Sequence, residues 1–438
     1  MKNYFNLYIA IALLGFISSC APTLDEFEPS KGSADFSQYI AVGNSLTSGY
    51  ADGGLYLAGQ KVAFPNLMAE QFRSVGGGEF NSPFFTQDQE NGSGYIRLKS
   101  LVEGNPVTEA VTDKLAIRGT VPGSNPAKPL YTKYLEPIQN LGVPGMRLDM
   151  SFLPGIGSVN GNPFFERLLA DEASLSTKYV DYASEHDHTF FSLWLGNNDV
   201  LGYATNGAAA SEDPTKILIS TAAFEDLYTQ FVDALTQQEQ KGIVATIPDV
   251  SAVPFLNTVT TARLNAAVDA ASEGQVKNVF IATKTGSRIA TEEDLFVLTF
   301  PTALLGQPDD NQIPYGMHPQ NPIADQYVLD KTETKEVVDR IKEINKKIIA
   351  IAQTKDLAVA DVYTFMNKVK AGYTFNGFLI SSAFITGNAF SMDGIHLTPI
   401  GNALVANLFI EAINKKYKAK IAKVDVNNYH GVLIPNGQ

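Results

Sequence analysis

The sequence predicts an α/β fold in which a parallel sheet is covered by helices on both faces. Short apolar runs typical of buried strands alternate along the chain with longer segments of helical periodicity. The strands are expected at residues 38–42, 189–195, 243–247 and 357–362. The main helices are expected at residues 62–72, 221–239, 337–351 and 398–416.

Spacing and end signals support these assignments. Val337, Ile341 and Ile344 stand four and three residues apart, and the same alternation continues to Ile351, which places one apolar stripe on a helix. The run at 243–247 has the β-branched content of a strand. Thr398 followed by Pro399 is typical of a helix start, because threonine caps free N–H groups and proline suits the first turn.

Composition narrows the class of partner and cofactor. The chain has 438 residues, of which 45% are hydrophobic and 18% charged, as in globular proteins. Its formal net charge is -13, and such a negative surface repels the phosphate backbone of a nucleic acid. We therefore expect no nucleic-acid partner. A single cysteine excludes disulfides within the chain and cysteine-rich metal clusters. No motif implies a metal or another cofactor.

Two stretches interrupt the alternation of strands and helices. Residues 75–137 are rich in Gly, Pro and Asn, and residues 252–330 contain Pro-rich segments of poor periodicity. Structureless loops of this length are uncommon within a compact domain. We therefore expect one domain, residues 36–417, with two insertions that carry structure of their own, followed by a tail at 418–438.

The first residues have the pattern of a targeting segment. Lys2 precedes an apolar run from Leu7 to Ile17, which is too short to span a bilayer since that takes about 20 helical residues. The run leads into Ser18, Ser19 and Cys20, and this ending resembles the lipobox of bacterial lipoproteins. It predicts a signal peptide at 1–19, a lipid on Cys20, a tether at 20–35, and export to a bacterial membrane, which we take to be the outer one. The alternative is an ordinary secretory signal with an incidental cysteine.

Four short motifs place reactive side chains at the ends of expected strands or before a helix. The first strand runs into Gly-Asn-Ser45-Leu, and a second strand end carries Asn-Leu-Gly-Val-Pro-Gly145. A third motif, Gly-Asn-Asn198-Asp, follows the strand at 189–195. The fourth is Asp393-Gly-Ile-His396, just before the last helix. Each motif alone is compatible with an ordinary turn.

The order of these motifs resembles the SGNH (GDSL) hydrolase family over residues 36–416. The resemblance implies a three-layer α/β/α sandwich with a flavodoxin-like parallel sheet, in which the four motifs meet at one edge. It implies that Ser45 is the nucleophile, Asp393 the acid and His396 the base. The backbone N–H groups of Ser45 and Gly145 and the amide of Asn198 would form the oxyanion hole.

One position departs from the family pattern. Asn44 stands where the family usually has Asp, and it keeps the size and the acceptor oxygen of that residue. Asn197 occupies the variable position of its motif and carries no expected role.

The leading hypothesis is a serine esterase that hydrolyses carboxylic esters through an acyl-enzyme. Its substrate would be a small-molecule or lipid acyl ester, or an acetyl ester on a glycan. For the lipid version, the candidate residues of an acyl pocket are Phe84, Phe85, Phe164 and Phe165. The alternative is a non-catalytic surface lipoprotein that uses the same scaffold to bind a ligand.

Overall fold

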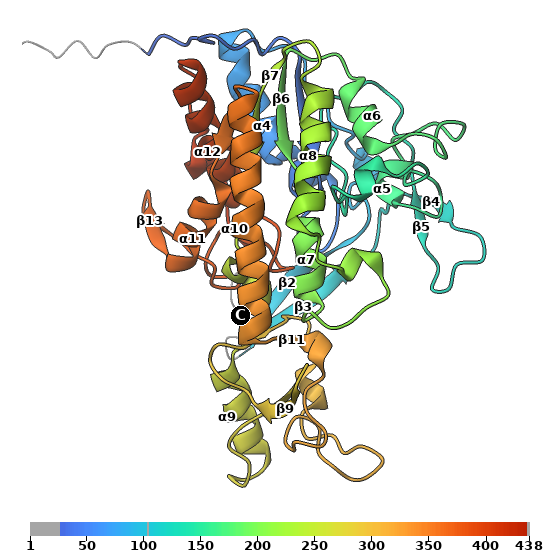
Figure 1. The fold of residues 1–438 in the computed structure, drawn as a ribbon, viewed down its shortest axis with the longest axis vertical. Helices are drawn as coiled ribbons and strands as arrows, with labels where there is room; N and C mark the ends of the chain where they lie inside the picture. The colour runs from blue at the N-terminus through green and yellow to red at the C-terminus, as the bar shows by residue number, and fades with distance from the viewer. Residues whose placement is uncertain (1–26, 103–104, 436–438) are drawn as a thin grey trace, which may run out of the picture.

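The computed structural model describes residues 27–102 and 105–435, and a parallel sheet lies at its centre (Figure 1). The sheet has four strands in the order β1-β6-β7-β12, and every neighbouring pair is parallel. Their bounds are β1 (Tyr39–Gly43), β6 (Phe190–Trp194), β7 (Lys241–Ala245) and β12 (Ala358–Ala360). These are the four predicted strands, shifted by at most a few residues.

A fifth segment, residues 139–143, runs beside β1 on its free side. The N–H of Ala41 donates to the carbonyl of Gln139 at 2.8 Å, and the N–H of Leu141 donates back to Ala41 at 2.8 Å. The N–H of Val143 continues the ladder to Gly43 at 3.0 Å. With this segment counted second along the chain, the spatial order is 2-1-3-4-5, which is the flavodoxin-like order. The predicted fold class is confirmed.

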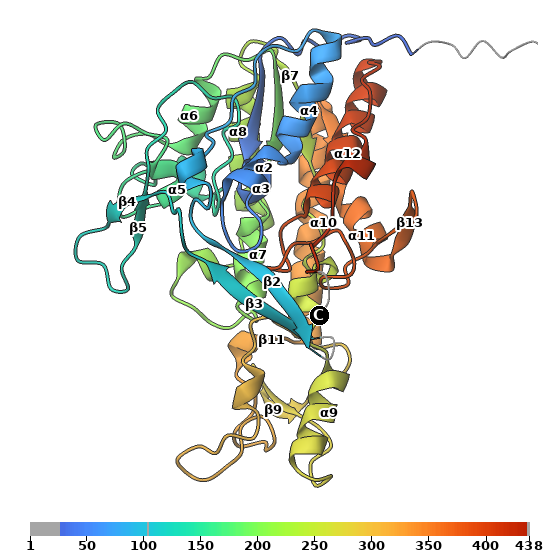
Figure 2. The same cartoon turned by 180° about the vertical axis from the view of Figure 1, so that it is seen from behind.

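Helices cover both faces of the sheet (Figures 1 and 2). On one face Ile40 and Val42 share a core with α8 (Thr221–Leu235) and α10 (Lys331–Thr354). On the other face Tyr39 and Ala41 share a core with α4 (Phe64–Phe72) and α12 (Pro399–Tyr417). Because successive strand residues point to opposite faces, each strand supplies both cores, which is why the strands read as continuous apolar runs.

Local signals set the ends of the helices. Asp330 and Glu333 form a capping box at the start of α10. The hydroxyl of Thr398 accepts from the N–H of Gly401 at 3.1 Å and so caps α12, as the sequence predicts. The last strand is shorter than predicted because Val362 already begins α11 (Val362–Ala371), whose first turn is capped by Asp361.

Both interrupting stretches contain secondary structure of their own. The first holds a hairpin of β2 (Tyr95–Val102) and β3 (Asn105–Val111), then the pair β4 (Ile117–Thr120) and β5 (Pro129–Tyr131). The second projects beyond the carboxyl ends of the sheet strands (Figure 1). It comprises α9 (Thr261–Ala271), the pair β8 (Phe280–Thr283) and β9 (Gly286–Ile289), and the pair β10 (Leu295–Phe296) and β11 (Val328–Leu329).

The packed part of the chain extends beyond the predicted limits of 36–417. Ser30 pairs with Lys420, and Ala34 is buried although it falls in the predicted tether. In the predicted tail, Val424 and Val426 are buried against the core that contains α12. Apolar side chains of both segments belong to the core that contains α12. The composition of these segments did not reveal that they pack there. The predicted signal peptide and the predicted lipidation site, Cys20, lie outside the described residues. No helix within the described ranges is long and apolar enough to cross a bilayer.

Candidate active site

Ser45 lies at the carboxyl end of β1, on a tight turn into the one-turn helix α2 (Ser45–Ser48). Gly43 permits this turn, because a Cβ there would lie 2.2 Å from Thr47 Oγ1 and 2.6 Å from the carbonyl oxygen of Trp194. The side-chain oxygen of Asn44 accepts from the N–H of Leu46 at 3.2 Å and caps the helix. Asn44 therefore performs the capping that the acceptor oxygen of an Asp would perform.

His396 and Asp393 complete a hydrogen-bonded chain with Ser45. His396 Nε2 lies 2.8 Å from Ser45 Oγ, and His396 Nδ1 lies 2.8 Å from Asp393 Oδ2. The other carboxylate oxygen of Asp393 accepts from the N–H groups of Ile395 and His396, both at 2.9 Å. One turn therefore holds both side chains, and the Nδ1–H tautomer leaves Nε2 free to accept the serine proton.

The surroundings of Asp393 keep its carboxylate ionised. Burial by itself would raise the pKa of Asp393, but the adjacent His396 and the hydrogen bonds from the turn outweigh burial and hold this pKa well below its ordinary value. Two further donors point at the same carboxylate: the N–H of Gly53 at 2.9 Å and the hydroxyl of Ser391 at 3.1 Å.

Residues of the turn at 50–53, which sequence reasoning missed, support Asp393 and His396. The ring of Tyr50 packs against the imidazole of His396, with ring centroids 4.8 Å apart. Asp52 accepts from the N–H of Met392 at 2.8 Å, and burial raises the pKa of Asp52. In the sequence, this segment has only the signal of a Gly-rich turn, so nothing there marks it as part of a site.

Asn198 and Gly145 lie at the same edge of the sheet. Asn198 begins α7 (Asn198–Thr205) directly after β6, and its Nδ2 donates one hydrogen to the carbonyl of Met146 at 3.0 Å. No residue in the described part of the chain accepts the second Nδ2 hydrogen. Gly145 is exposed and has φ +76°. Within the described ranges, the backbone N–H groups of Ser45 and Gly145 have no hydrogen-bond partner.

Asp199 and Arg147 tie the loop of Gly145 to the start of α7. The fully buried carboxylate of Asp199 accepts from the N–H of Leu148 at 2.8 Å and of Asp149 at 3.2 Å. Arg147 donates to the carbonyl of Asn198 at 3.0 Å and pairs with Asp149 at 2.7 Å. Burial, which the nearby Arg147 only partly offsets, raises the pKa of Asp199 to about 6. These contacts fix the loop that carries Gly145 relative to the first turn of α7, about 50 residues later in the chain.

Two adjoining cavities open beside these side chains. The smaller, about 50 Å³, is lined by Ser45, His396 and Asn198, and otherwise mostly by apolar side chains: Leu46, Val200, Leu201, Ile247, Pro248, Val250, Val253 and Ile395. The larger, about 270 Å³, shares Asn198, Leu201 and Ile395 with it and includes Gly145 and Phe255. None of the described residues of the 75–137 stretch lines either cavity.

The idea that four phenylalanines line an acyl pocket next to Ser45 is wrong for these two cavities. Phe85 and Phe165 are buried in hydrophobic cores. Phe164 stacks on Tyr131 with ring centroids 4.9 Å apart, and Phe84 packs in the same small core as Phe85. Phe84, Phe85 and Phe164 thus pack the 75–137 stretch against the domain, whereas Phe165 belongs to the main core with Tyr179 and Tyr182.

The second interrupting stretch packs directly on the turn that carries Asp393 and His396. The N–H of Phe255 donates to the carbonyl of Gly394 at 2.9 Å. Gly394 has φ +72°, and a Cβ there would lie 3.0 Å from the nitrogen of Phe255, so glycine is required at this close approach.

A parallel sheet covered by helices, with a serine, a histidine and a carboxylate hydrogen-bonded to one another at one edge, is the arrangement of a hydrolase. In agreement, the family model described as GDSL-like Lipase/Acylhydrolase matches residues 39–409, and the chain belongs to this family. The family points to ester hydrolysis.

Among solved structures, the chain is similar to the "lipase/acylhydrolase from Enterococcus faecalis". The two sequences are 13% identical, the match covers 88% of this chain and 98% of that chain, and the TM-score is 0.32. No curated protein matches the chain.

Proposed function

We propose that the protein is a serine esterase that hydrolyses carboxylic esters through an acyl-enzyme intermediate. The observation that carries the proposal is the chain of two 2.8 Å contacts that joins Ser45, His396 and Asp393. A serine hydroxyl is a weak nucleophile at neutral pH unless a base lies within hydrogen-bond reach, and this geometry provides that base.

The chemistry follows from these contacts. His396 Nε2 takes the proton of Ser45 as Oγ bonds to the ester carbonyl carbon, and Asp393 stabilises the imidazolium that forms. The tetrahedral intermediate then collapses, the bond to the alcohol oxygen breaks, and His396 gives its proton to that oxygen. In deacylation, His396 takes a proton from water as the water oxygen attacks the acyl carbon. The bond between Ser45 Oγ and the acyl carbon then breaks, and His396 returns the proton to Oγ.

We expect three neutral donors to stabilise the negative charge that develops on the carbonyl oxygen. They are the N–H groups of Ser45 and Gly145 and the second Nδ2 hydrogen of Asn198. Such donors act only as charge develops, so they lower the barrier rather than tighten substrate binding.

The small cavity beside Ser45 favours a short acyl group. A cavity needs a volume of about 10–15 Å³ to hold one water-sized group. The 50 Å³ cavity beside Ser45 therefore accommodates about four non-hydrogen atoms. We therefore propose acyl groups of two to four carbons, with acetyl esters on a glycan favoured over long-chain lipids. The 270 Å³ cavity would hold the remainder of the substrate.

Two assays test the proposed reaction. A fluorophosphonate probe should label the wild-type protein and fail to label the Ser45→Ala variant. A series of p-nitrophenyl esters should then show the highest kcat/KM for acetate to butyrate, with a steep fall by octanoate. Absence of labelling in folded protein would favour the ligand-binding scaffold, and a maximum at octanoate would favour a lipase.

We further propose that the mature protein is exported and anchored by a lipid on Cys20, which supports a substrate outside the cytoplasm. The support is the lipobox-like sequence that ends at Cys20. Cells expressing the full chain should hold it in the membrane fraction and incorporate labelled palmitate, whereas Cys20→Ala should abolish the incorporation. Palmitate incorporation that persists in this variant would contradict the assignment.

A further inference from the structure

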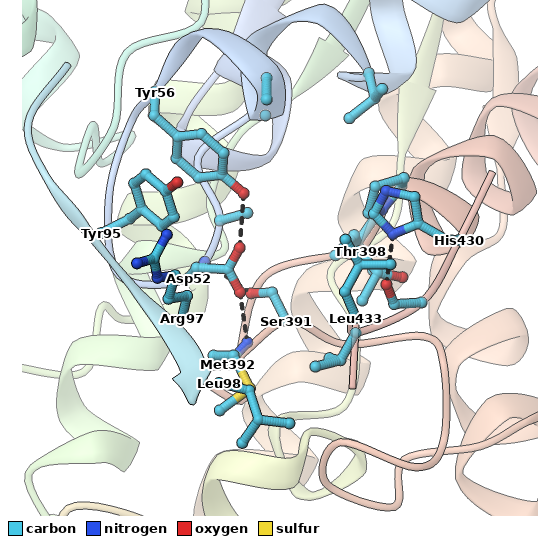
Figure 3. Close-up of a pocket in the computed structure, with 18 of the residues that line it drawn as sticks. Asp52, Tyr56, Tyr95, Arg97, Leu98, Ser391, Met392, Thr398, His430 and Leu433 are labelled. Carbon is cyan, nitrogen blue, oxygen red and sulfur yellow. Dashed lines mark hydrogen bonds between the residues drawn. The ribbon is translucent and has the colours of Figure 1, made fainter. Parts of the chain in front are cut away.

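A separate cavity of about 530 Å³ lies next to the turn that carries Asp393 (Figure 3). It shares no lining residue with the 50 Å³ cavity beside Ser45 or with the 270 Å³ cavity beside Gly145. Four segments form its walls: residues 49–62, β2, the region from Ser391 to the start of α12, and residues 430–435. Its volume is within the range of small-molecule sites, which is about 300–1,000 Å³.

Most of the wall is apolar. The side chains that form it include Ile96, Leu98, Met392, Leu397, Val432 and Leu433. Leu433 is 66% exposed and Ile434, also part of the wall, is 51% exposed. An apolar chain placed in the cavity would remove this surface from water, which stabilises a complex by about 25 cal/mol per Å² buried.

The polar groups on one wall offer donors. The carboxylate of Asp52 is already engaged, since it accepts from the hydroxyl of Tyr56 at 2.6 Å and from the N–H of Met392 at 2.8 Å. Tyr95 stacks on Tyr56 with ring centroids 4.1 Å apart. Arg97 lies beside Tyr95 (Figure 3) and uses its Nε for Glu109 at 2.5 Å, so its two terminal nitrogens remain free within the described ranges.

We propose that this cavity binds a single-chain carboxylate of medium length, with its apolar chain against Leu98 and Met392 and its carboxylate on Arg97. Arginine is suited to this head group because its planar fork matches a carboxylate in two parallel hydrogen bonds. The cavity is distinct from the proposed reaction centre, because neither Ser45 nor His396 lines it, although Asp52 and Ser391 of its wall also support the turn that carries Asp393.

Titration calorimetry with decanoate tests the proposal on the full mature chain. We expect one site per chain with a dissociation constant in the micromolar range, and at least tenfold weaker binding of decan-1-ol, which has the same chain without the charge. Arg97→Gln should weaken decanoate binding at least tenfold. Lys99→Gln, which removes the same charge from an exposed position on the same strand, should change it less than twofold.

A second variant tests the place of the chain. Ala58 is exposed on α3 (Leu57–Lys61) and lines the cavity, so Ala58→Trp should fill it and abolish decanoate binding while the melting temperature stays close to that of wild type. If this variant does not fold, the exposed Arg97→Gln variant decides the question.

Three results would overturn the proposal: no decanoate binding at 1 mM, binding that survives both Arg97→Gln and Ala58→Trp, or decyl phosphate that binds at least tenfold tighter than decanoate. The last would assign the site to a phosphate head group instead. Because none of these measurements requires Ser45, a failure here leaves the esterase proposal standing, and a failure of probe labelling leaves this proposal standing.

Discussion

Replacing Asn198 with alanine isolates one donor of the proposed oxyanion hole. Its Nδ2 has two hydrogens, and one of them is committed to the carbonyl of Met146 at 3.0 Å. Asn198→Ala therefore removes a single hydrogen bond to the reacting oxygen. The loop that carries Gly145 keeps its other anchor, because Asp199 still accepts from the N–H groups of Leu148 and Asp149.

The magnitude follows from the loss of one donor. Removal of one such group costs about 2.7–4 kcal/mol of transition-state stabilisation, which lowers kcat by about 10²–10³. KM should change by less than about threefold, because the ground-state carbonyl oxygen carries little of the charge that the donor stabilises.

The neighbouring asparagine provides a matched control. Both polar atoms of the Asn197 side chain are buried and have no hydrogen-bond partner within the described ranges, so Asn197→Ala should cost little stability and lower kcat by less than about tenfold. Steady-state kinetics on p-nitrophenyl acetate compare the two variants. If Asn197→Ala proved the more damaging, or if Asn198→Ala raised KM and left kcat unchanged, the oxyanion-hole assignment would be refuted.

Three further predictions concern residues that hold the site in place. Asp52→Ala should lower kcat by about ten- to a hundredfold with little change in KM, because the N–H of Met392 loses its acceptor and the turn that carries Asp393 loosens. An unchanged kcat would exclude this positioning role. Gly394→Ala should lower the free energy of unfolding by about 1–2 kcal/mol in urea titrations, because of its positive φ and the close approach of Phe255; full stability would contradict the close contact. The pKa of Asp199 is raised from 3.8 to about 6, so as pH falls the folded state binds this proton before the unfolded state does. The contribution of Asp199 to the free energy of unfolding should therefore grow by about 2.4 kcal/mol as pH falls from 7 to 4. Urea titrations of wild type against Asp199→Asn at both pH values measure this, and a difference between the two proteins that does not vary with pH would contradict the raised pKa.

The sequence allowed the layers to be predicted from local patterns, and the grouping of Ser45, Asp393 and His396 to be predicted from the resemblance to a known family. The strands β1, β6, β7 and β12 are buried on both faces, and the resulting apolar runs are visible without any tertiary information. The three-residue spacing of Asp393 and His396 was enough to predict that one turn would hold both side chains.

Other features had no local signal. Asp52 and Tyr50 sit in an ordinary Gly-rich turn, and their contacts with Met392 and His396 join segments about 340 residues apart along the chain. Ala34 and Val424 had no local signal either. Both are buried in the core that contains α12, so the packed domain extends beyond the predicted limits of 36–417.

The sequence by itself determined the kinds of reactive group and the order in which they occur, because residue type and spacing along one strand or turn are fixed by the covalent chain. Only the tertiary structure decided the shape around them: a 50 Å³ space beside Ser45, phenylalanines used for packing, and a second cavity near Asp393. Cavity shape depends on how side chains from distant segments fill the space between them, and no local pattern encodes that.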